Sequence, residues 1–434
     1  MDDTFNLREL GIIAQFIQLA ALCASVALVL HVARRGMQGN HLILLASVMA
    51  VPQALFCFLV SDTVWAFEDF RKAYWKAGHA VLSGPQNLIE AFDLKMGTEA
   101  FVNIPIVAYL FAPLGLLDAR SAGFLFSALG IPVMGITVWL LAKTFRLSAR
   151  STAILILAFS TFGPLYYSFR QGNTSHLAIP ALLAGILLVR ARKDFLAGVI
   201  YGAAAVFKLP LLLVGVYYFL RGRFGVAMGG AAVLAVTGVL SLLVFGWDMH
   251  VLWYEVCVAP FGKNPIPAFN AQSIAATFAK FELSPDMLNV WRVHEVSPLA
   301  GALSRGINAA LVLGAALVIW RGRRLTSKET LDGELIIMVV LACLLSPLSW
   351  SHYYAWLVIP FAFLLAKAEE GLLGRRALVV LGASWLLSAP LIFWYESRQF
   401  GIYAIIGNLH LMVGSLMMLG LMIYWRERRN CMPA

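Results

Sequence analysis

Apolar stretches of about 20 residues recur along this chain from residue 11 to residue 424, and no other feature limits its fold as strongly. One such stretch, folded as an α-helix, is long enough to cross the hydrocarbon core of a bilayer. Lipid offers no hydrogen bonds to the backbone, so a crossing segment of this kind must be helical. Of the 434 residues, 61% are hydrophobic and 13% are charged, against about 25% charged residues in a soluble domain. The sequence therefore predicts an all-α polytopic membrane protein.

The apolar runs predict about thirteen membrane crossings. Three of these runs, 195–207, 208–220 and 353–367, are short for a membrane crossing. The polar gaps are smaller than an independent domain, so residues 1–434 are expected to form a single integral membrane domain. The expected spans are 11–33, 41–61, 121–142, 151–168, 174–190, 195–207, 208–220, 226–246, 301–320, 333–350, 353–367, 376–394 and 403–424.

The net charge of +10 indicates membrane orientation and does not indicate a nucleic-acid partner, because Lys and Arg gather in the cytoplasmic loops of polytopic proteins. Placing the basic clusters inside puts the N-terminus and two long loops, 62–120 and 247–300, outside. The apolar run 101–117 contains two prolines and would invert the later charge pattern if it crossed, so we expect an outer juxtamembrane helix there. The clusters are RARK (190–193), RGR (221–223), RGRR (321–324) and RERR (426–429).

The predicted spans hold almost no Asp or Glu, so carboxylate chemistry must come from the outer loops. Asp69 opens a polar and aromatic segment in the first of them. A carboxylate there can take the proton of an acceptor hydroxyl as it attacks an anomeric carbon. One carboxylate suffices for inversion, because a leaving phosphate needs no proton. The structural alternative is that Asp69 is the N-cap of a helix over 70–82.

Lys208 lies between two apolar half-segments, where an ammonium is costly unless it meets a partner or water. Pro210 follows two residues later and predicts a break in the helix. The break would place the ammonium at the outer face against a lipid phosphate. The alternative is a lysine that snorkels to the lipid headgroups.

Three further groups are candidates for binding a substrate. Gln171 and Asn173 lie in the polar segment RQGNTSH and could bond sugar hydroxyls, or form a plain outer turn. His352 stands among aromatic residues and could bind a phosphate or sugar oxygen, or belong to an interfacial aromatic belt. Arg305 is a further candidate for a phosphate, or an interfacial anchor. The histidines are scattered and no HExxH or Walker A pattern is present, so we expect no resident metal or cofactor.

Six segments in order resemble the GT-C glycosyltransferases of glycosyltransferase family 87, over residues 60–360. They are DFRKAYWKAGHAVLSG (69–84), NIPIVAYLFAPLGLLD (103–118), RQGN (170–173), AGVIYGAAAVFKLPLLL (197–213), NAQS (270–273) and SPLSWSHYY (346–354).

The resemblance implies a GT-C-type helix bundle in a bacterial-type inner (plasma) membrane, with an active site on the outer face. The donor would be a polyprenyl-phosphate sugar, carrying mannose or another hexose, and the acceptor a lipid-linked glycan or envelope glycoconjugate. The family's acidic residue, lysine and histidine correspond to Asp69, Lys208 and His352. In this interpretation Asp69 is the base, and Lys208, His352 and Arg305 bind the donor phosphate. The residues expected to contact the sugar or acceptor are Tyr74, Asn103, Gln171, Asn173, Asn270 and Gln272.

Two other classes of function stay open at this point. A secondary transporter or lipid flippase could use the broken segment around Lys208 and Pro210 as a midplane substrate site. Such proteins usually carry inverted repeats, which the sequence does not clearly show. An assembly scaffold is the third possibility, and the polar residues gathered in the outer loops disfavour it.

The topology leads to a direct prediction. A reporter fused after Gly84 should be extracytoplasmic, and one fused after Arg192 should be cytoplasmic, because the basic clusters remain inside. Paired fusions to a reporter active outside and to a reporter active inside measure this. A cytoplasmic signal at Gly84 would place Asp69 on the wrong face for a donor used outside.

Overall fold

The structure is a computed structural model that describes residues 7–60, 66–92, 101–390, 405–406 and 409–431. It is 81% helical, and its described residues contain no strand beyond an isolated bridge between Ala271 and Trp350. The all-α prediction is therefore confirmed. Parts of the predicted loop 62–120, and of the predicted spans 41–61, 376–394 and 403–424, lie outside the described residues.

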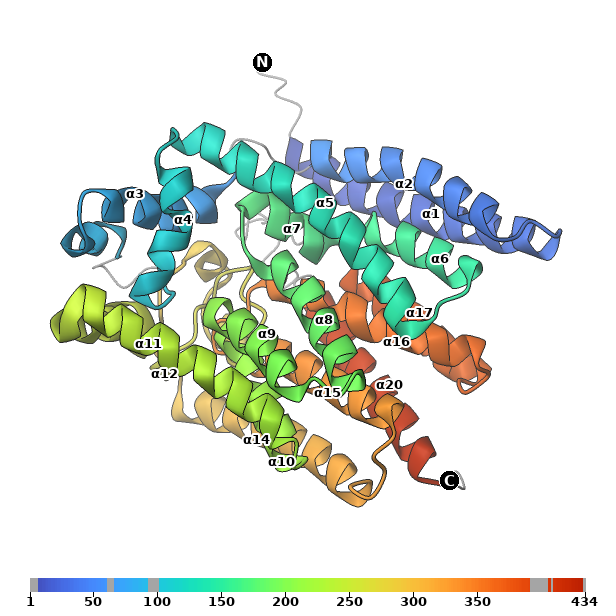
Figure 1. Ribbon diagram of the computed structural model, residues 1–434. Coiled ribbons are helices and arrows are strands. Elements are labelled where there is room, and N and C mark those ends of the chain that lie inside the picture. Colours follow the sequence, from blue (N-terminus) through green and yellow to red (C-terminus); the bar gives the residue numbers. More distant parts are fainter. Residues whose placement is uncertain (1–6, 61–65, 93–100, 391–404, 407–408, 432–434) are drawn as a thin grey trace, which may run out of the picture.

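The helices follow one another in Figure 1 from α1 to α20. The first half contains α1 (Leu7–Arg34), α2 (Asn40–Val60), η1 (Phe70–Trp75), α3 (Lys76–Leu82), η2 (Pro85–Ala91), η3 (Pro105–Val107), α4 (Ala108–Gly115), α5 (Ala119–Phe145), α6 (Ala149–Phe159), α7 (Gly163–Gln171), η4 (Ser175–Leu177), α8 (Ala178–Arg190), α9 (Asp194–Phe207), η5 (Leu209–Leu211) and α10 (Leu212–Leu220). The second half contains α11 (Phe224–Trp253), η6 (Tyr254–Val258), α12 (Ala259–Lys263), α13 (Ile274–Glu282), η7 (Pro285–Asn289), α14 (Pro298–Arg321), α15 (Lys328–Leu345), η8 (Ser351–Leu357), α16 (Val358–Glu369), α17 (Arg375–Ser388) and α20 (His410–Cys431).

Five of the described helices are long and apolar enough to cross a membrane, namely α1, α2, α5, the helix that continues from α11 to Lys263, and α14. The pair α6 and α7, bent by 51°, would make a sixth. These helices expose large apolar side chains, such as Leu243 at 78% and Leu313 at 68%, as a lipid-facing surface does. The structure thus supports a multi-pass membrane protein, while the count of about thirteen spans stays a prediction.

The centre of the bundle consists of α15 and α16, whose side chains are almost all buried. Hydropathy placed the start of this span at residue 333, but α15 begins at Lys328. The difference arises because the side chain of Ser327 accepts a hydrogen bond from the backbone of Thr330 and caps the helix. The early start brings Asp332 and Glu334 inside the bundle, where both are buried.

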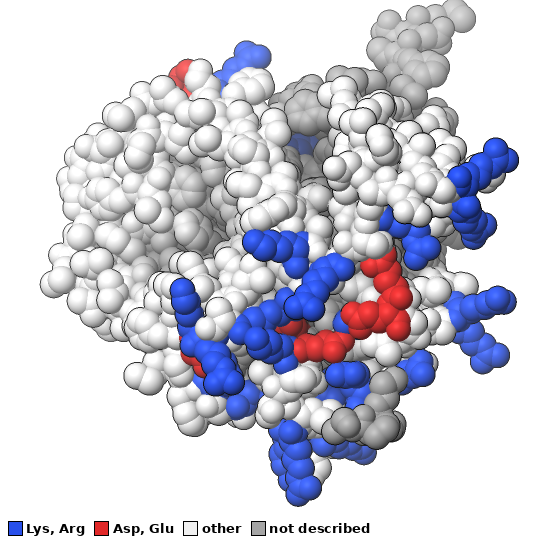
Figure 2. Space-filling model, turned by 45° about the vertical axis from the view of Figure 1, so that its right-hand side comes forward, with Lys and Arg blue, Asp and Glu red and all other residues white. Residues whose placement is uncertain are grey.

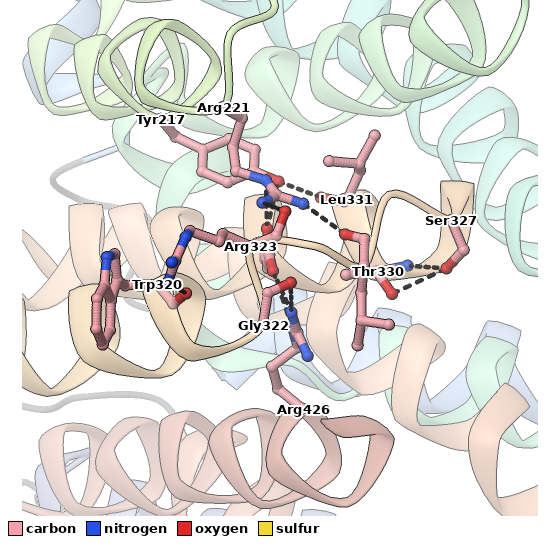
Figure 3. Close-up of polar contacts among 11 residues, drawn as sticks. Tyr217, Arg221, Trp320, Gly322, Arg323, Ser327, Thr330, Leu331 and Arg426 are labelled. Atoms are coloured by element: carbon pink, nitrogen blue, oxygen red, sulfur yellow. Dashed lines mark hydrogen bonds and ion pairs between the residues drawn. The ribbon is translucent and has the colours of Figure 1, made fainter. Parts of the chain in front are cut away.

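Glu334 is neutralised by two arginines from other helices. Arg426 of α20 lies 2.7 Å from one carboxylate oxygen and Arg221 lies 3.1 Å from the other, to which Tyr217 also donates at 3.0 Å. Figure 3 shows the two arginines reaching from opposite sides toward the turn between α14 and α15. A buried carboxylate is tolerated only with such partners. The cluster therefore ties α10, α15 and α20 together at one end of the bundle.

Helices α9 and α11 touch through their backbones. Each carries glycines four residues apart at the contact, a spacing that lets membrane helices approach closely. A Cβ added at Gly198 would lie 2.0 Å from the carbonyl oxygen of Val226, and one at Gly229 would lie 2.1 Å from that of Phe195. This contact fixes the position of α9, and with it the lysine at its C-terminal end.

We predict that Gly229→Ala destabilises the protein by about 1–3 kcal/mol, because the added methyl group overpacks the contact with α9. Gly238→Ala is the matched control in the same helix, where a Cβ would meet nothing within 4 Å. Alanine there should be neutral or stabilising by about 0.5–1 kcal/mol, since glycine costs entropy inside a helix. Thermal unfolding in detergent measures both. Equal melting temperatures for the two variants would contradict the contact.

Candidate active site

A cavity of about 200 Å³ lies where η1, the end of α7, the end of α9 and the loops before α13 and η8 converge. Both predicted outer loops contribute to it. It collects eight of the ten site residues expected from the sequence, namely Asp69, Tyr74, Asn103, Gln171, Asn173, Lys208, Asn270 and His352. These residues come from six separate segments of the chain, so the fold brings the distant motifs to one place.

The segments NAQS and SWSH are joined by their backbones. The amide of Gln272 donates to the carbonyl of Ser349 at 2.6 Å, and the amide of Ser351 donates to that of Asn270 at 2.8 Å. Lys280, fully buried in α13, donates to the carbonyl of Ala271 at 2.5 Å and holds the loop from behind. The two motifs therefore form one wall of the cavity.

The segment that carries Asp69 is seated on RQGN. The amide of Phe67 donates to the carbonyl of Arg170 at 2.6 Å. Gly172 has φ +66°, and a Cβ there would lie 2.5 Å from the Cβ of Phe70. Both its backbone conformation and the close approach require glycine. The RQGN segment thus positions the candidate base. It is not only the plain turn that its sequence also allowed.

Asp69 is not a helix N-cap. Its own backbone is helical and its side chain makes no capping hydrogen bond, which contradicts the structural alternative. A π-helix over Phe70–Trp75 follows it, an irregularity that is frequent at functional sites. The carboxylate instead accepts a hydrogen bond from Asn173 at 2.8 Å through Oδ2.

One amide joins Asp69 to Lys208. While the Nδ2 group of Asn173 donates to Asp69, its Oδ1 accepts from the ammonium of Lys208 at 2.7 Å. Helix α9 ends at Lys208, with φ −139° and ψ 86°, so the chain breaks where Pro210 predicts. The ammonium is buried and lies 4.7 Å from the ring centroid of Tyr353. A buried ammonium with these contacts faces the cavity, so the snorkelling alternative is contradicted.

The cavity changes the acidity of Asp69. Burial raises the pKa of its carboxyl to about 6, and the hydrogen bond from Asn173 and the charge of Lys208 only partly oppose this effect. A carboxylate whose pKa lies near the working pH is suited to take a proton and release it again. The raised pKa therefore fits a general base.

His352 has no hydrogen-bond partner in the described structure. Its imidazole is 3% exposed, lines the cavity, and leaves both ring nitrogens unbonded. The ring lies nearly parallel to that of Tyr167, at 11° and 6.3 Å between centroids. Buried polar groups are almost always bonded, and an exception calls for an explanation. A ligand oxygen in the cavity would supply the missing bond.

The amides around the cavity are largely committed to the protein. Asn103 donates to the carbonyls of Val206 and Phe207 at the end of α9, at 3.2 and 3.1 Å. Asn270 donates to the hydroxyl of Tyr167 at 2.9 Å and accepts from the indole of Trp291 at 3.0 Å. These contacts orient the side chains that border the cavity and leave fewer of their groups free to bond a ligand.

Two expected site residues do not line the cavity. Gln272 is buried behind it, and its side chain donates to the carbonyl of Phe269 at 2.8 Å. Arg305 is exposed on α14. Among the other outer carboxylates, Asp248 and Glu255 are also exposed and lie off the cavity. The structure therefore gathers the candidate base, one lysine and one histidine, without the arginine.

Sequence reasoning missed three residues that the structure places at the site. Tyr167 was counted inside a membrane span, although its hydroxyl meets Asn270. Trp291 and Lys280 sit in an outer loop whose motifs did not include them. The available signal for Lys280 was a lysine in the otherwise apolar segment 274–281, which directly follows the NAQS motif.

A model of glycosyltransferase family 87 matches residues 101–347, which is more than half of the chain. The chain belongs to glycosyltransferase family 87. The match includes Asn103, Asn173 and Lys208 but ends short of Asp69 on one side and His352 on the other. Both residues line the same cavity as Asn103, Asn173 and Lys208, so this cavity extends beyond the matched region.

Three curated relatives are similar to this family member. A polyprenol-phosphate-mannose-dependent alpha-(1-2)-phosphatidylinositol pentamannoside mannosyltransferase of Mycolicibacterium smegmatis is 27% identical over 337 residues, 75% of this chain and 77% of that protein. A protein of the same name from Mycobacterium tuberculosis is 26% identical over 242 residues, 52% and 49% of the two chains. A phosphatidylinositol mannoside mannosyltransferase of Mycobacterium tuberculosis, also polyprenol-phosphate-mannose-dependent, is 25% identical over 314 residues, 68% and 67% of the two chains.

Proposed function

We propose that this glycosyltransferase moves a sugar, mannose or another hexose, from a polyprenyl-phosphate carrier to a lipid-linked glycan or envelope glycoconjugate. The names of its relatives support this donor, and their acceptors are lipids that already carry sugars. In this proposal the chain is a single GT-C-type membrane domain in a bacterial-type inner membrane. Its catalytic cavity opens on the extracytoplasmic side, away from the basic clusters.

The observation that carries the proposal is the set of groups in the cavity. A carboxylate with raised pKa, a buried ammonium and an unbonded imidazole line one small space. An acceptor hydroxyl needs the first of these groups, and a leaving phosphate needs the other two. One carboxylate for the acceptor and two groups for the phosphate are the groups that one inverting sugar transfer requires.

In the proposed reaction, Asp69 accepts the proton of the acceptor hydroxyl as its oxygen attacks the anomeric carbon of the donor. The bond between that carbon and the phosphate oxygen breaks, and the electron pair leaves with the phosphate. Lys208 and an N–H of His352 stabilise the charge that develops there, the contribution that preorganised donors make to catalysis. The carrier phosphate departs unprotonated, so the reaction needs no general acid.

Glu68 is the competing carboxylate, because it too lines the cavity. It forms an ion pair with Lys72 at 2.5 Å, one helical turn away. That contact engages Glu68 with a cation. Asp69, in the described structure, accepts its side-chain hydrogen bond from the neutral amide of Asn173 and is the better candidate for the base.

The transporter or flippase alternative is not taken further. Membership of a glycosyltransferase family favours chemistry on a sugar, and the broken segment at Lys208 is accounted for by the cavity. Transfer from a panel of radiolabelled polyprenyl-phosphate sugars to endogenous lipid or glycan tests the proposed function directly. Transport of a labelled substrate without any transfer would overturn it.

We predict that Asp69→Asn folds and binds donor but loses turnover by about 10²–10⁴-fold, the usual contribution of a positioned base. Asparagine keeps the size of the side chain and removes its basicity. Glu68→Gln is the matched control, with the same loss of charge at the next residue and in the same cavity. It should retain most of the activity in the transfer assay. Full activity in Asp69→Asn would exclude the single-carboxylate mechanism.

The pH profile gives an independent measurement of the same prediction. Because the pKa of Asp69 is raised to about 6, the base is protonated below that pH and available above it. Turnover should therefore rise as the pH increases through about 6, with about a tenfold loss for each pH unit below it. The Glu68→Gln variant should keep this limb of the profile. If the Glu68→Gln substitution shifts this limb of the pH profile, Glu68 is the general base and Asp69 is not.

We also predict that Lys208→Ala and His352→Ala each weaken the use of donor by about 10- to 100-fold, the effect of losing one charge-assisted contact to a phosphate. Arg305→Ala is the control, since its side chain is exposed away from the cavity. The dependence of the initial rate on donor concentration distinguishes the variants. If only Arg305→Ala weakens donor use, the phosphate is bound on α14.

A further inference from the structure

A second cavity, of about 630 Å³, lies at the far end of α9. It forms where three turns meet, those between α8 and α9, α10 and α11, and α14 and α15. Helix α9 begins beside it at Asp194 and ends 14 residues later at the catalytic cavity. At about 1.5 Å per residue, the two cavities are separated by about 21 Å of helix. The proposed transfer reaction uses no residue of this second cavity.

The cavity is positively charged. Four basic and two acidic side chains line it, which gives a net charge of +2. Arg190 is paired with Asp332 at 2.6 Å, and Arg223 with Asp194 at 2.7 Å. The two remaining cations, Arg192 and Lys328, are exposed and have no acidic partner among the residues that the structure describes. Figure 2 shows Lys and Arg side chains gathered around Asp and Glu side chains on this end of the molecule.

Two helix N-termini add to this charge. Both α9 and α11 begin at the cavity, and neither has a side chain that caps its first turn. The free N–H groups and the positive end of the helix dipole favour an anion such as a phosphate. By contrast, α15 begins nearby with its first turn capped by Ser327.

The buried carboxylate of Asp332 supplies an independent constraint on the ligand. Its side chain is 1% exposed, and its Oδ2 takes both contacts with Arg190. Among the described residues its Oδ1 is buried without a hydrogen-bond partner, in a residue that lines the cavity. This oxygen needs a hydrogen-bond donor, which the ionised phosphodiester group of a lipid does not provide. A ligand that carries a hydroxyl group next to its phosphate would satisfy both ends of the cavity.

The surroundings of the cavity favour a lipid over a soluble phosphate. Phe224 forms part of its lining and is exposed, and Phe195 and Leu220 beside it are exposed as well. The positive-inside rule places this end of the bundle in the cytoplasm, where anionic lipids attract basic groups. Acyl chains could thus lie along apolar side chains while the headgroup enters the cavity.

The walls of the cavity are held in place by the buried cluster described above. Arg221 donates to the carbonyls of Arg323 and Leu325 at 2.9 and 2.6 Å, and Arg426 donates to that of Gly322 at 3.0 Å. These bonds fix the turn that leads directly to Lys328 (Figure 3). The turn that precedes Lys328 is therefore held in a fixed position by the fold.

We propose that this cavity binds the headgroup of an anionic phospholipid that carries hydroxyl groups. The phosphate lies between Arg192, Lys328 and the N-termini of α9 and α11. A headgroup hydroxyl donates to Oδ1 of Asp332, and the acyl chains lie against Phe224 and its apolar neighbours. The site is separate from the catalytic cavity, and the proposal does not depend on the identity of the donor or acceptor.

The test measures the binding of short-chain phosphatidylglycerol to the full-length protein in detergent by native mass spectrometry. Phosphatidylmethanol is the matched ligand with the same charge and no hydroxyl, and phosphatidylcholine is the ligand without net charge. We expect affinity to fall in that order. Each basic side chain near an anionic headgroup contributes about fivefold, so Arg192→Gln with Lys328→Gln should weaken phosphatidylglycerol binding by roughly 30-fold.

The control variant is Arg321→Gln with Arg324→Gln, which removes two charges from the same end of the bundle but not from the cavity lining. It should bind phosphatidylglycerol as the unmodified protein does. Equal losses in the two double variants would overturn the site. Equal affinity for phosphatidylmethanol would overturn the role of Asp332. If glycerol 3-phosphate binds as tightly as the lipid, the ligand is soluble and the lipid assignment is wrong.

Discussion

A charge buried in an apolar helix bundle needs a partner, because its desolvation costs several kcal/mol. This constraint determines the polar contacts at both ends of the helix bundle. At one end Glu334 is contacted by two arginines and a tyrosine, which satisfies its charge within the fold. At the other end, within the described residues, Lys208 donates to the neutral amide of Asn173 and the ring nitrogens of His352 have no hydrogen-bond partner. The first arrangement stabilises the fold, while the second leaves groups free for a substrate.

Several irregular stretches of backbone lie beside the candidate active site. Phe67 adopts φ +62°, which is rare for a residue other than glycine, and a π-helix begins three residues later. Lys208 separates α9 from the short helix η5. The π-helix and this break both carry polar side chains that line the cavity, among them Tyr74 and Lys208. Such local strain persists where the surrounding packing holds it in place.

The candidate site was partly readable from the residues. Asp69, Lys208 and His352 were identified because polar groups are scarce in so apolar a chain, and the structure places all three in one cavity. The sequence alone could not show that Arg305 lies apart from these three residues. A basic residue near the end of a span can bind a phosphate or anchor the span at the interface equally well. The bridging position of Asn173 was hidden, because it depends on two residues 104 and 35 positions away.

The sequence by itself determined the class of the protein, because long apolar runs can cross lipid only as helices. It also determined the glycine spacing that joins α9 to α11 and the proline break after Lys208. Only the tertiary structure decided which polar groups meet. Hydropathy describes each segment separately, whereas the candidate catalytic cavity and the basic cavity are each formed by segments that are distant along the chain. Their contacts follow from how the helices pack against one another, and no local pattern records that packing.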